Sequence, residues 1–182
     1  MPNQSGKAYG LTVLCPLKEV DDSGKSVTIK LKNTLLNLKE SPMQKVPNTY
    51  LARFYILEDV FYEDAPYELE HLKSKYLVFT SNFYGERDEY LRGMYKAMKE
   101  EIVEVWQDCY GFSKDRFTEN DFIQFIEDCQ VDTTFYFNGS TDESLEEQLK
   151  ALYLKQEFSK FVFENAHAGA DDLLASFNKF VA

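Results

Sequence analysis

Apolar and polar residues alternate in four short segments of the chain, which is the pattern of strands that bury one side. The clearest is residues 50–59 (YLARFYILED), which is dense in the aromatic and branched side chains that favour strands. The other three are residues 11–17 (LTVLCPL), 75–83 (KYLVFTSNF) and 133–138 (TTFYFN). We expect each of these four segments to be a β-strand.

Elsewhere apolar residues recur every three or four positions, which predicts amphipathic helices. Residues 26–39 fit both periods, but the helical stripe is the longer, so we assign a helix there. A helix of about six turns follows Gly85, and Gly111 is expected to end it. Thr118 and Asp121 form a capping box that begins a short helix.

Two more helices are predicted at the end of the chain. Ser140 and Glu143 form a capping pair for a helix that continues toward Phe161. A final helix spans about 170–181, after Gly169. The first of these helices carries one stripe of mostly apolar residues: Leu145, Leu149, Leu152 and Gln156.

The main elements of residues 11–138 follow the order β-α-β-β-α-β. This is the ferredoxin-like arrangement, in which two right-handed crossovers place both helices on one face of a four-stranded antiparallel sheet. We therefore predict an α+β fold with additional C-terminal helices. At this length the chain, residues 1–182, is expected to be a single domain, with an N-terminal tail over 1–10 and a helical extension over 139–182.

Strand side chains point alternately to the two faces of a sheet, so each strand divides into two sets. One set, which includes Arg53 in the middle of a strand, mixes apolar and polar residues and suits the wall of a cavity or a wet interface. Either the C-terminal helices or a second copy of the protein would cover it. The other set is almost all apolar and should lie under the crossover helices: Leu11, Val13, Cys15, Ala52, Phe54, Ile56, Leu77, Phe79, Ser81, Phe83, Phe135 and Phe137.

Charge excludes some partners. Lys and Arg number 20 against 31 Asp and Glu, which leaves a net charge of −11 on 182 residues. Nucleic acids and anionic membranes bind through clustered Lys and Arg, so we expect no nucleic-acid partner. No apolar run approaches the roughly 18 residues of a membrane span. Aromatic residues make up 15% of the chain and supply flat surfaces for a core, a pocket or an interface.

The first residues, MPNQSGKAYG, lack the apolar region of a secretory signal. The three cysteines, Cys15, Cys109 and Cys129, show no C-x-x-C spacing, which fits reduced and mostly buried thiols. We therefore expect a cytoplasmic protein.

The segments LTVLCPL, YLARFYILED, KYLVFTSNF and TTFYFN, by their order and their two-faced pattern, resemble the dimeric α+β-barrel superfamily over roughly residues 11–138. In that superfamily ferredoxin-like units pack sheet to sheet around a ligand cavity, so the resemblance implies a homodimer. Haem enzymes similar to dye-decolourising peroxidases and chlorite dismutases belong to it, as do cofactor-free monooxygenases. The haem members use a proximal histidine with a distal acid and arginine, whereas this chain has only His71 and His167.

Arg53 is the first candidate ligand-binding residue, because a guanidinium in mid-strand is costly unless it meets a carboxylate, a ligand anion or water. The ordinary alternative is a salt bridge to one of the 31 acidic residues. Tyr55, Asn82, Tyr136 and Asn138 share its face and can donate hydrogen bonds to a ligand. Their ordinary alternative is cross-strand packing with hydrated polar tips.

His167 lies between the last two predicted helices, and it would reach the rim of the cavity, as a haem-binding residue, if those helices cover the open face. The alternative is a solvated loop histidine. His71 lies in an acidic run with Glu68 and Glu70, but one histidine with carboxylates has no fixed ligand spacing, so we predict no metal site.

Several enzyme classes lose support because their motifs are missing. The sequence has no phosphate-binding Gly-rich loop, no G-x-S-x-G elbow and no H-E-x-x-H helix. Our leading hypothesis is a domain that binds a small, partly apolar and anionic molecule on the mixed sheet face. The alternatives are an oxidoreductase, either haem-dependent and peroxidase-like or cofactor-free and monooxygenase-like, and a protein-interaction subunit.

Overall fold

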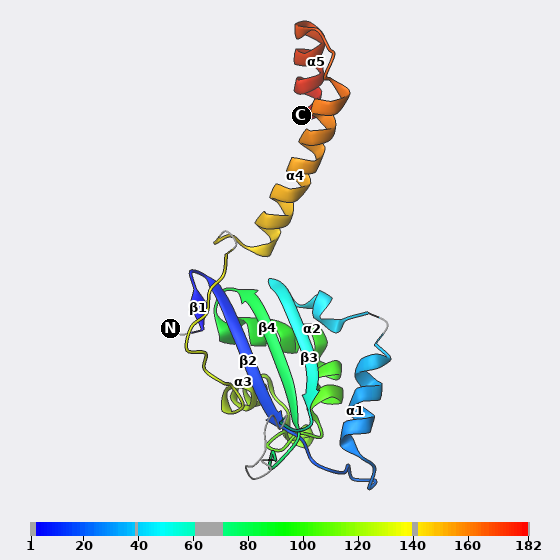
Figure 1. Ribbon diagram of the computed structural model, residues 1–182, viewed down its shortest axis with the longest axis vertical. Helices are drawn as coiled ribbons and strands as arrows, with labels where there is room; N and C mark the ends of the chain where they lie inside the picture. Colours follow the sequence, from blue (N-terminus) through cyan, green and yellow to red (C-terminus); the bar gives the residue numbers. More distant parts are fainter. Residues whose placement is uncertain (1–2, 39, 61–70, 140–141, 182) are drawn as a thin grey trace, which may run out of the picture. The chain divides into compact units, whose positions relative to one another are not determined.

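The computed structural model describes residues 3–38, 40–60, 71–139 and 142–181 (Figure 1). The chain divides into two compact units, Met1–Asp142 and Glu143–Ala182, which we describe separately. Within the described ranges no helix combines the length and the apolar character that a membrane crossing requires.

The first unit is an α+β fold built on a four-stranded antiparallel sheet in the order β1-β2-β4-β3. The three long strands confirm the segments predicted around residues 11–17, 50–59 and 75–83. The second strand begins at Ala8, so part of the expected N-terminal tail belongs to the sheet. The strands are β1 (Gln4–Ser5), β2 (Ala8–Pro16), β3 (Thr49–Leu57) and β4 (Tyr76–Tyr84).

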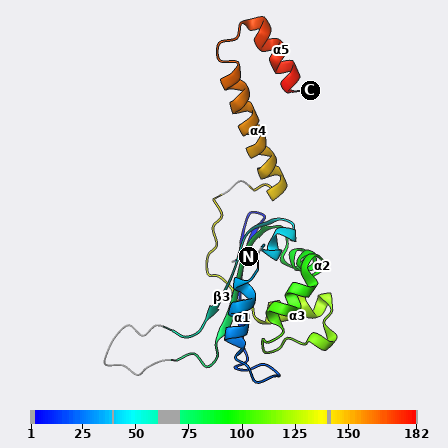
Figure 2. The same cartoon turned by 90° about the vertical axis from the view of Figure 1, so that its right-hand side faces the viewer.

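Three helices of this unit match the predicted ones. Figure 2 shows α2 and α3 on one face of the sheet, with α1 along the β3 edge. The capping box of Thr118 and Asp121 is formed, and α2 ends at Trp106, before Gly111. The helices are α1 (Val27–Leu36), α2 (Arg87–Trp106) and α3 (Glu119–Asp128), with short 3-10 turns η1 (Pro42–Lys45) and η2 (Lys114–Arg116).

The core lies between the sheet and these helices. Phe54 and Phe79 stack with ring centroids 4.7 Å apart, and Trp106 meets both rings edge-on. The apolar set of strand residues therefore faces the helices on β2, β3 and β4, as the alternation predicts.

The predicted strand over residues 133–138 is wrong. After α3 the chain pairs with β2 only briefly, at the bridge between Val13 and Gln130. Beyond that point the β2 edge is occupied by the start of the chain, because β1 pairs with residues 8–9 and the Asn3 carbonyl accepts the Gly10 N–H. As a result Phe135 and Phe137, expected under the helices, are 81% and 72% exposed.

The side chain of Asn3 holds the chain in this alternative path. Asn3 is buried, its Nδ2 donates to Asp132 Oδ1 at 3.0 Å, and its Oδ1 accepts the Thr133 N–H at 2.8 Å. These bonds take the place of the ladder that a fourth long strand would form with β2.

The second unit is a helical hairpin of α4 (Leu145–Glu164) and α5 (Ala170–Phe180), which confirms both predicted C-terminal helices. Ser144, rather than Ser140, caps α4 by accepting the Glu147 N–H; Ser140 lies outside the described residues. The helices meet through aromatic pairs that join Phe158 and Phe161 to α5. No side chain of these two helices, both fully described, is buried.

Candidate functional site

The candidate site is the face of the sheet opposite α2 and α3, which no described helix of the first unit covers (Figure 2). The strand register aligns the side chains of this face in rows across β2, β4 and β3. The central row is Thr12, Thr80 and Arg53. We use the name open face for the side chains of three rows: Gly10, Asn82, Leu51; Thr12, Thr80, Arg53; and Leu14, Val78, Tyr55.

Arg53 has no protein partner in the part of the chain that the structure describes. Its side chain is exposed and forms no hydrogen bond or ion pair with any described residue, so the salt bridge weighed as its ordinary alternative is not found there. Arg53 is also the only charged residue of the open face, in a chain with a net charge of −11. Its charge is therefore not neutralised by the described protein.

The neighbours of Arg53 offer apolar area and hydroxyl groups. Leu51 and Tyr55, two residues away on either side along β3, are each 49% exposed. Thr12 and Thr80 in the same row are half-buried. A guanidinium can form two parallel hydrogen bonds to a carboxylate or phosphate, so this arrangement suits an anionic group joined to an apolar body.

Tyr136 closes one end of the open face. Its ring lies against Gly10, where an added β-carbon would stand 2.7 Å from Tyr136 Cδ2. Burial raises the pKa of the Tyr136 hydroxyl above its ordinary value. The segment around Tyr136 therefore lies over the β2 end of the face although it is not a strand.

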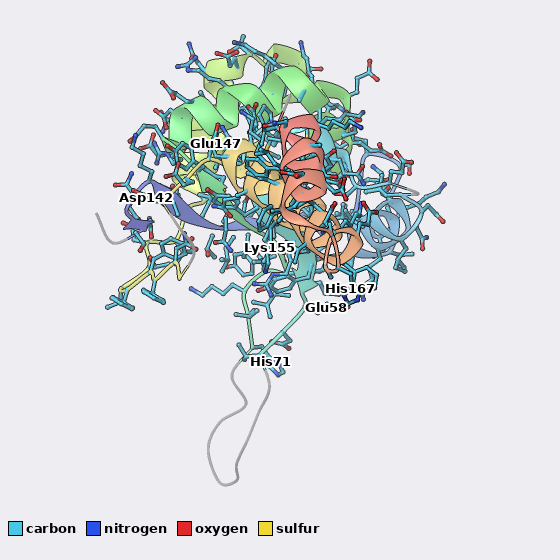
Figure 3. The ribbon with its side chains drawn as sticks, turned by 90° about the horizontal axis from the view of Figure 1, so that it is seen from above. Glu58, His71, Asp142, Glu147, Lys155 and His167 are labelled. Carbon is cyan, nitrogen blue, oxygen red and sulfur yellow. The ribbon has the colours of Figure 1, made fainter. Side chains whose placement is uncertain are left out.

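Further tyrosines surround that end. Burial raises the pKa of Tyr50, with smaller contributions from Tyr84, Asp142 and Tyr136, so these groups lie near one another. Asp142 Oδ1 accepts the Lys7 N–H at 2.6 Å, which holds the β1–β2 turn against this cluster. Figure 3 marks Asp142 beside β1.

The structure brings together some of the predicted ligand-binding residues but not all of them. Arg53, Tyr55 and Asn82 lie on adjoining rows of the open face, and Tyr136 covers Gly10 in the row of Asn82. Asn138 is half-buried on the segment beyond Tyr136 and already has an interaction partner.

Both histidines are exposed. Haem binding requires an axial imidazole beside an enclosed apolar pocket. His167 is exposed in the turn between α4 and α5. His71 is exposed too, and its Nδ1 lies 2.8 Å from Asp59 Oδ2. The cofactor-binding role of His167 stays a prediction.

A second hollow, of about 770 Å³, lies where β3 ends and β4 begins. Among its charged groups, Glu58 binds both Lys75 and Lys32, and these contacts lower the pKa of Glu58. An ion that binds Glu58 or Lys75 would have to compete with these pairs.

The three cysteines lie together, which their spacing in the sequence does not indicate. Antiparallel bridges at Leu17–Cys109 and Val13–Gln130 bring Cys109 and Cys129 to the two sides of Cys15. The hydrogen bond with Cys109 and then burial raise the pKa of the Cys15 thiol, and the bond with Cys15 raises that of Cys129. All three are free thiols.

This cluster is not a metal centre. Among the described residues no group of three or more His, Cys, Asp or Glu side chains is arranged to hold an ion. Protonated thiols are poor nucleophiles and poor ligands, so the cluster serves as packing in the core, as we expected of buried cysteines.

Comparisons with protein-family models, with curated proteins and with solved structures gave no match for this chain. The functional conclusion therefore rests on the residues described above.

Proposed function

We propose that this protein binds a small anionic molecule with an apolar body on the open face, and that Arg53 binds its anionic group. One observation carries the proposal: Arg53 is an exposed guanidinium without a described partner, on a face that is otherwise uncharged. In a chain with 31 acidic residues, a cation that meets none of the described ones is available to an external anion.

The roles of the other residues follow from their rows. Thr80 lies opposite Arg53, and Thr12 lies one strand farther along the same row, so their hydroxyls can donate to an anion bound along this row. Leu51 and Tyr55 provide the apolar contact for the body of the molecule. Asn82 lies in the same row as Gly10, and Tyr136 covers Gly10, so these two residues contact the part of the molecule that is farthest from its anionic group.

We also propose that the sheet of the first unit has a ferredoxin-like arrangement. The order β2-β4-β3, with α1 between β2 and β3, matches three strands of the ferredoxin-like pattern. We propose that β1 and the bridge at Gln130 share the place of its fourth strand. This supports the resemblance to the dimeric α+β barrels. The free thiols support the cytoplasm as the proposed compartment.

The test is binding of 2-naphthoate, a carboxylate on a flat apolar body, measured by isothermal titration calorimetry. We expect 2-naphthoate to bind and uncharged 2-naphthamide to bind much more weakly. Arg53→Gln should weaken 2-naphthoate binding about tenfold to a hundredfold, because a hydrogen bond to a charged group contributes about 1.5–3 kcal/mol.

Arg92→Gln is the matched control. It removes the same charge from α2, where Arg92 pairs with Glu119, and should leave the affinity unchanged. Equal affinity of wild type and Arg53→Gln, or an equal loss in both variants, would show that Arg53 does not bind the anion.

The oxidoreductase and protein-interaction alternatives stay predictions. The open face favours ligand binding over these two alternatives, because the Arg53 guanidinium and the hydroxyls of its row can donate hydrogen bonds to an anion.

A further inference from the structure

Helix α4 carries apolar residues on two opposite sides. One side, with Phe158 and Phe161, packs against α5. The opposite side follows the alternating four-three spacing of a coiled-coil seam. We call this side the seam; its residues are Leu145, Leu149, Leu152, Gln156, Ser159 and Phe163.

The seam is open to solvent in this unit. Leu149 is 57% exposed, Leu152 is 55% exposed and Phe163 is 84% exposed. A helical hairpin without buried side chains gains little from its own packing, and a helix as short as the 11-residue α5 is marginal in water on its own. A helix that is apolar on opposite sides is normally covered on both.

We propose that a second copy of this chain covers the seam, with the two α4 helices antiparallel. This surface is separate from the open face and goes beyond the proposed function. In the antiparallel register Leu145 lies opposite Phe163 of the second copy, Leu149 opposite Ser159, and Leu152 opposite Gln156. Every polar seam residue then faces an apolar one, and no layer joins two polar residues.

The Ser159 side chain can be buried in such a seam without losing a hydrogen bond. Its Oγ donates a hydrogen bond to the Lys155 carbonyl at 2.8 Å, so the hydroxyl needs no partner across the interface. The remaining polar seam residue, Gln156, favours one register, as a single polar residue does in coiled coils.

Charges beside the seam favour the antiparallel orientation. Antiparallel helices place Glu146 next to Lys160 of the second copy, twice per dimer, whereas parallel helices place Lys155 next to Lys160, which repel. Lys160 now pairs with Glu157 of its own helix at 2.5 Å, an exposed pair that is readily exchanged. Antiparallel packing also brings the two copies of Lys155 together, which is its one unfavourable contact.

The oligomeric state of the full chain tests the proposal, by light scattering during size-exclusion chromatography over a concentration series. We expect a dimer that Leu149→Glu with Leu152→Glu weakens at least tenfold. Leu154→Glu is the matched control, because Leu154 is 59% exposed on α4 but lies off the seam, and it should leave the dimer intact. Circular dichroism checks that each variant keeps its helices.

A wild-type monomer at all concentrations, or equal weakening by the control variant, would overturn the proposal. A monomer would mean that the seam packs within one chain or on a different protein.

Charge exchange gives a second check: Lys160→Glu should weaken the dimer, and adding Glu146→Lys should restore it. Lys155→Gln should strengthen it.

Cross-linking tests the orientation. In a Cys129→Ser background, Tyr153→Cys lies beside the two-fold axis and should link to itself through a short bismaleimide. Leu145→Cys should not, because antiparallel packing separates the two copies of residue 145 by about 27 Å along the helix. Efficient linking of Leu145→Cys would indicate parallel helices and contradict the proposed arrangement.

Discussion

The ring of Tyr136 occupies the space that a side chain at Gly10 would need, with Cδ2 and Cε2 both 2.7 Å from the position of a β-carbon. This contact ties an irregular segment to the central part of the sheet. It also explains why a glycine stands in the middle of a strand, where it otherwise weakens pairing.

Gly10→Ala should therefore be destabilising only while Tyr136 is present. In the wild-type background the new methyl group must displace the ring, and urea unfolding should show a loss of stability. In a Tyr136→Ala background the same change should be neutral or stabilising, by about 0.4–1 kcal/mol, because alanine restricts the unfolded chain. Equal effects in both backgrounds would mean that the ring does not rest on Gly10.

Asn3→Ala should destabilise the first unit by about 1–3 kcal/mol, because it removes the hydrogen bonds of the buried Asn3 side chain to Asp132 and Thr133, each of which contributes about 0.5–1.5 kcal/mol. Chemical denaturation measures the change, and Gln4→Ala at the half-buried neighbouring position is the control. A loss below about 0.5 kcal/mol would show that Asn3 does not hold residues 132–133 in place.

Local periodicity predicted the long strands and all the helices, because alternation and helical stripes record which side of each element is buried. It failed at residues 133–138, whose β-propensity is as high as that of β3. Propensity says nothing of whether an edge is free, and here Asn3 and β1 already occupy the edge that this segment would need.

The candidate site was predictable to a similar extent. The face shared by Arg53, Tyr55 and Asn82 follows from strand alternation alone. Whether Arg53 meets an acidic side chain depends on contacts between distant parts of the chain, and so does the gathering of the cysteines around Cys15.

The cysteines should resist labelling in the folded protein. Raised pKa values keep Cys15 and Cys129 protonated at neutral pH, and the thiolate is the reactive form. Ellman's reagent at pH 8 should react fully only after unfolding in guanidinium chloride, with half-buried Cys129 the first to respond. Rapid reaction of all three thiols in the native protein would contradict the buried cluster.

Asp21 should make stability depend on pH in acid. Ser23 Oγ and the Lys25 N–H donate to its carboxylate and lower its pKa to about 2. Because the folded pKa is below the unfolded value of about 3.9, the ionised group stabilises the fold above that value, and the contribution is lost as the pH falls toward 2. Asp21→Asn should therefore lower Tm clearly at pH 6 and much less at pH 2, where about half of the Asp21 carboxyl groups are protonated. A difference in Tm that is the same at both values would disprove this role.

NMR of the arginine side chains shows whether the Arg53 guanidinium binds the anionic group. The chain has 4 arginines, so their Nε–Hε signals are few, and the Arg53→Gln variant identifies the one that matters. We predict that 2-naphthoate shifts the Arg53 signal saturably and leaves that of Arg92 unchanged, whereas 2-naphthamide shifts neither. An Arg53 signal that stays in place while 2-naphthoate binds would contradict the account.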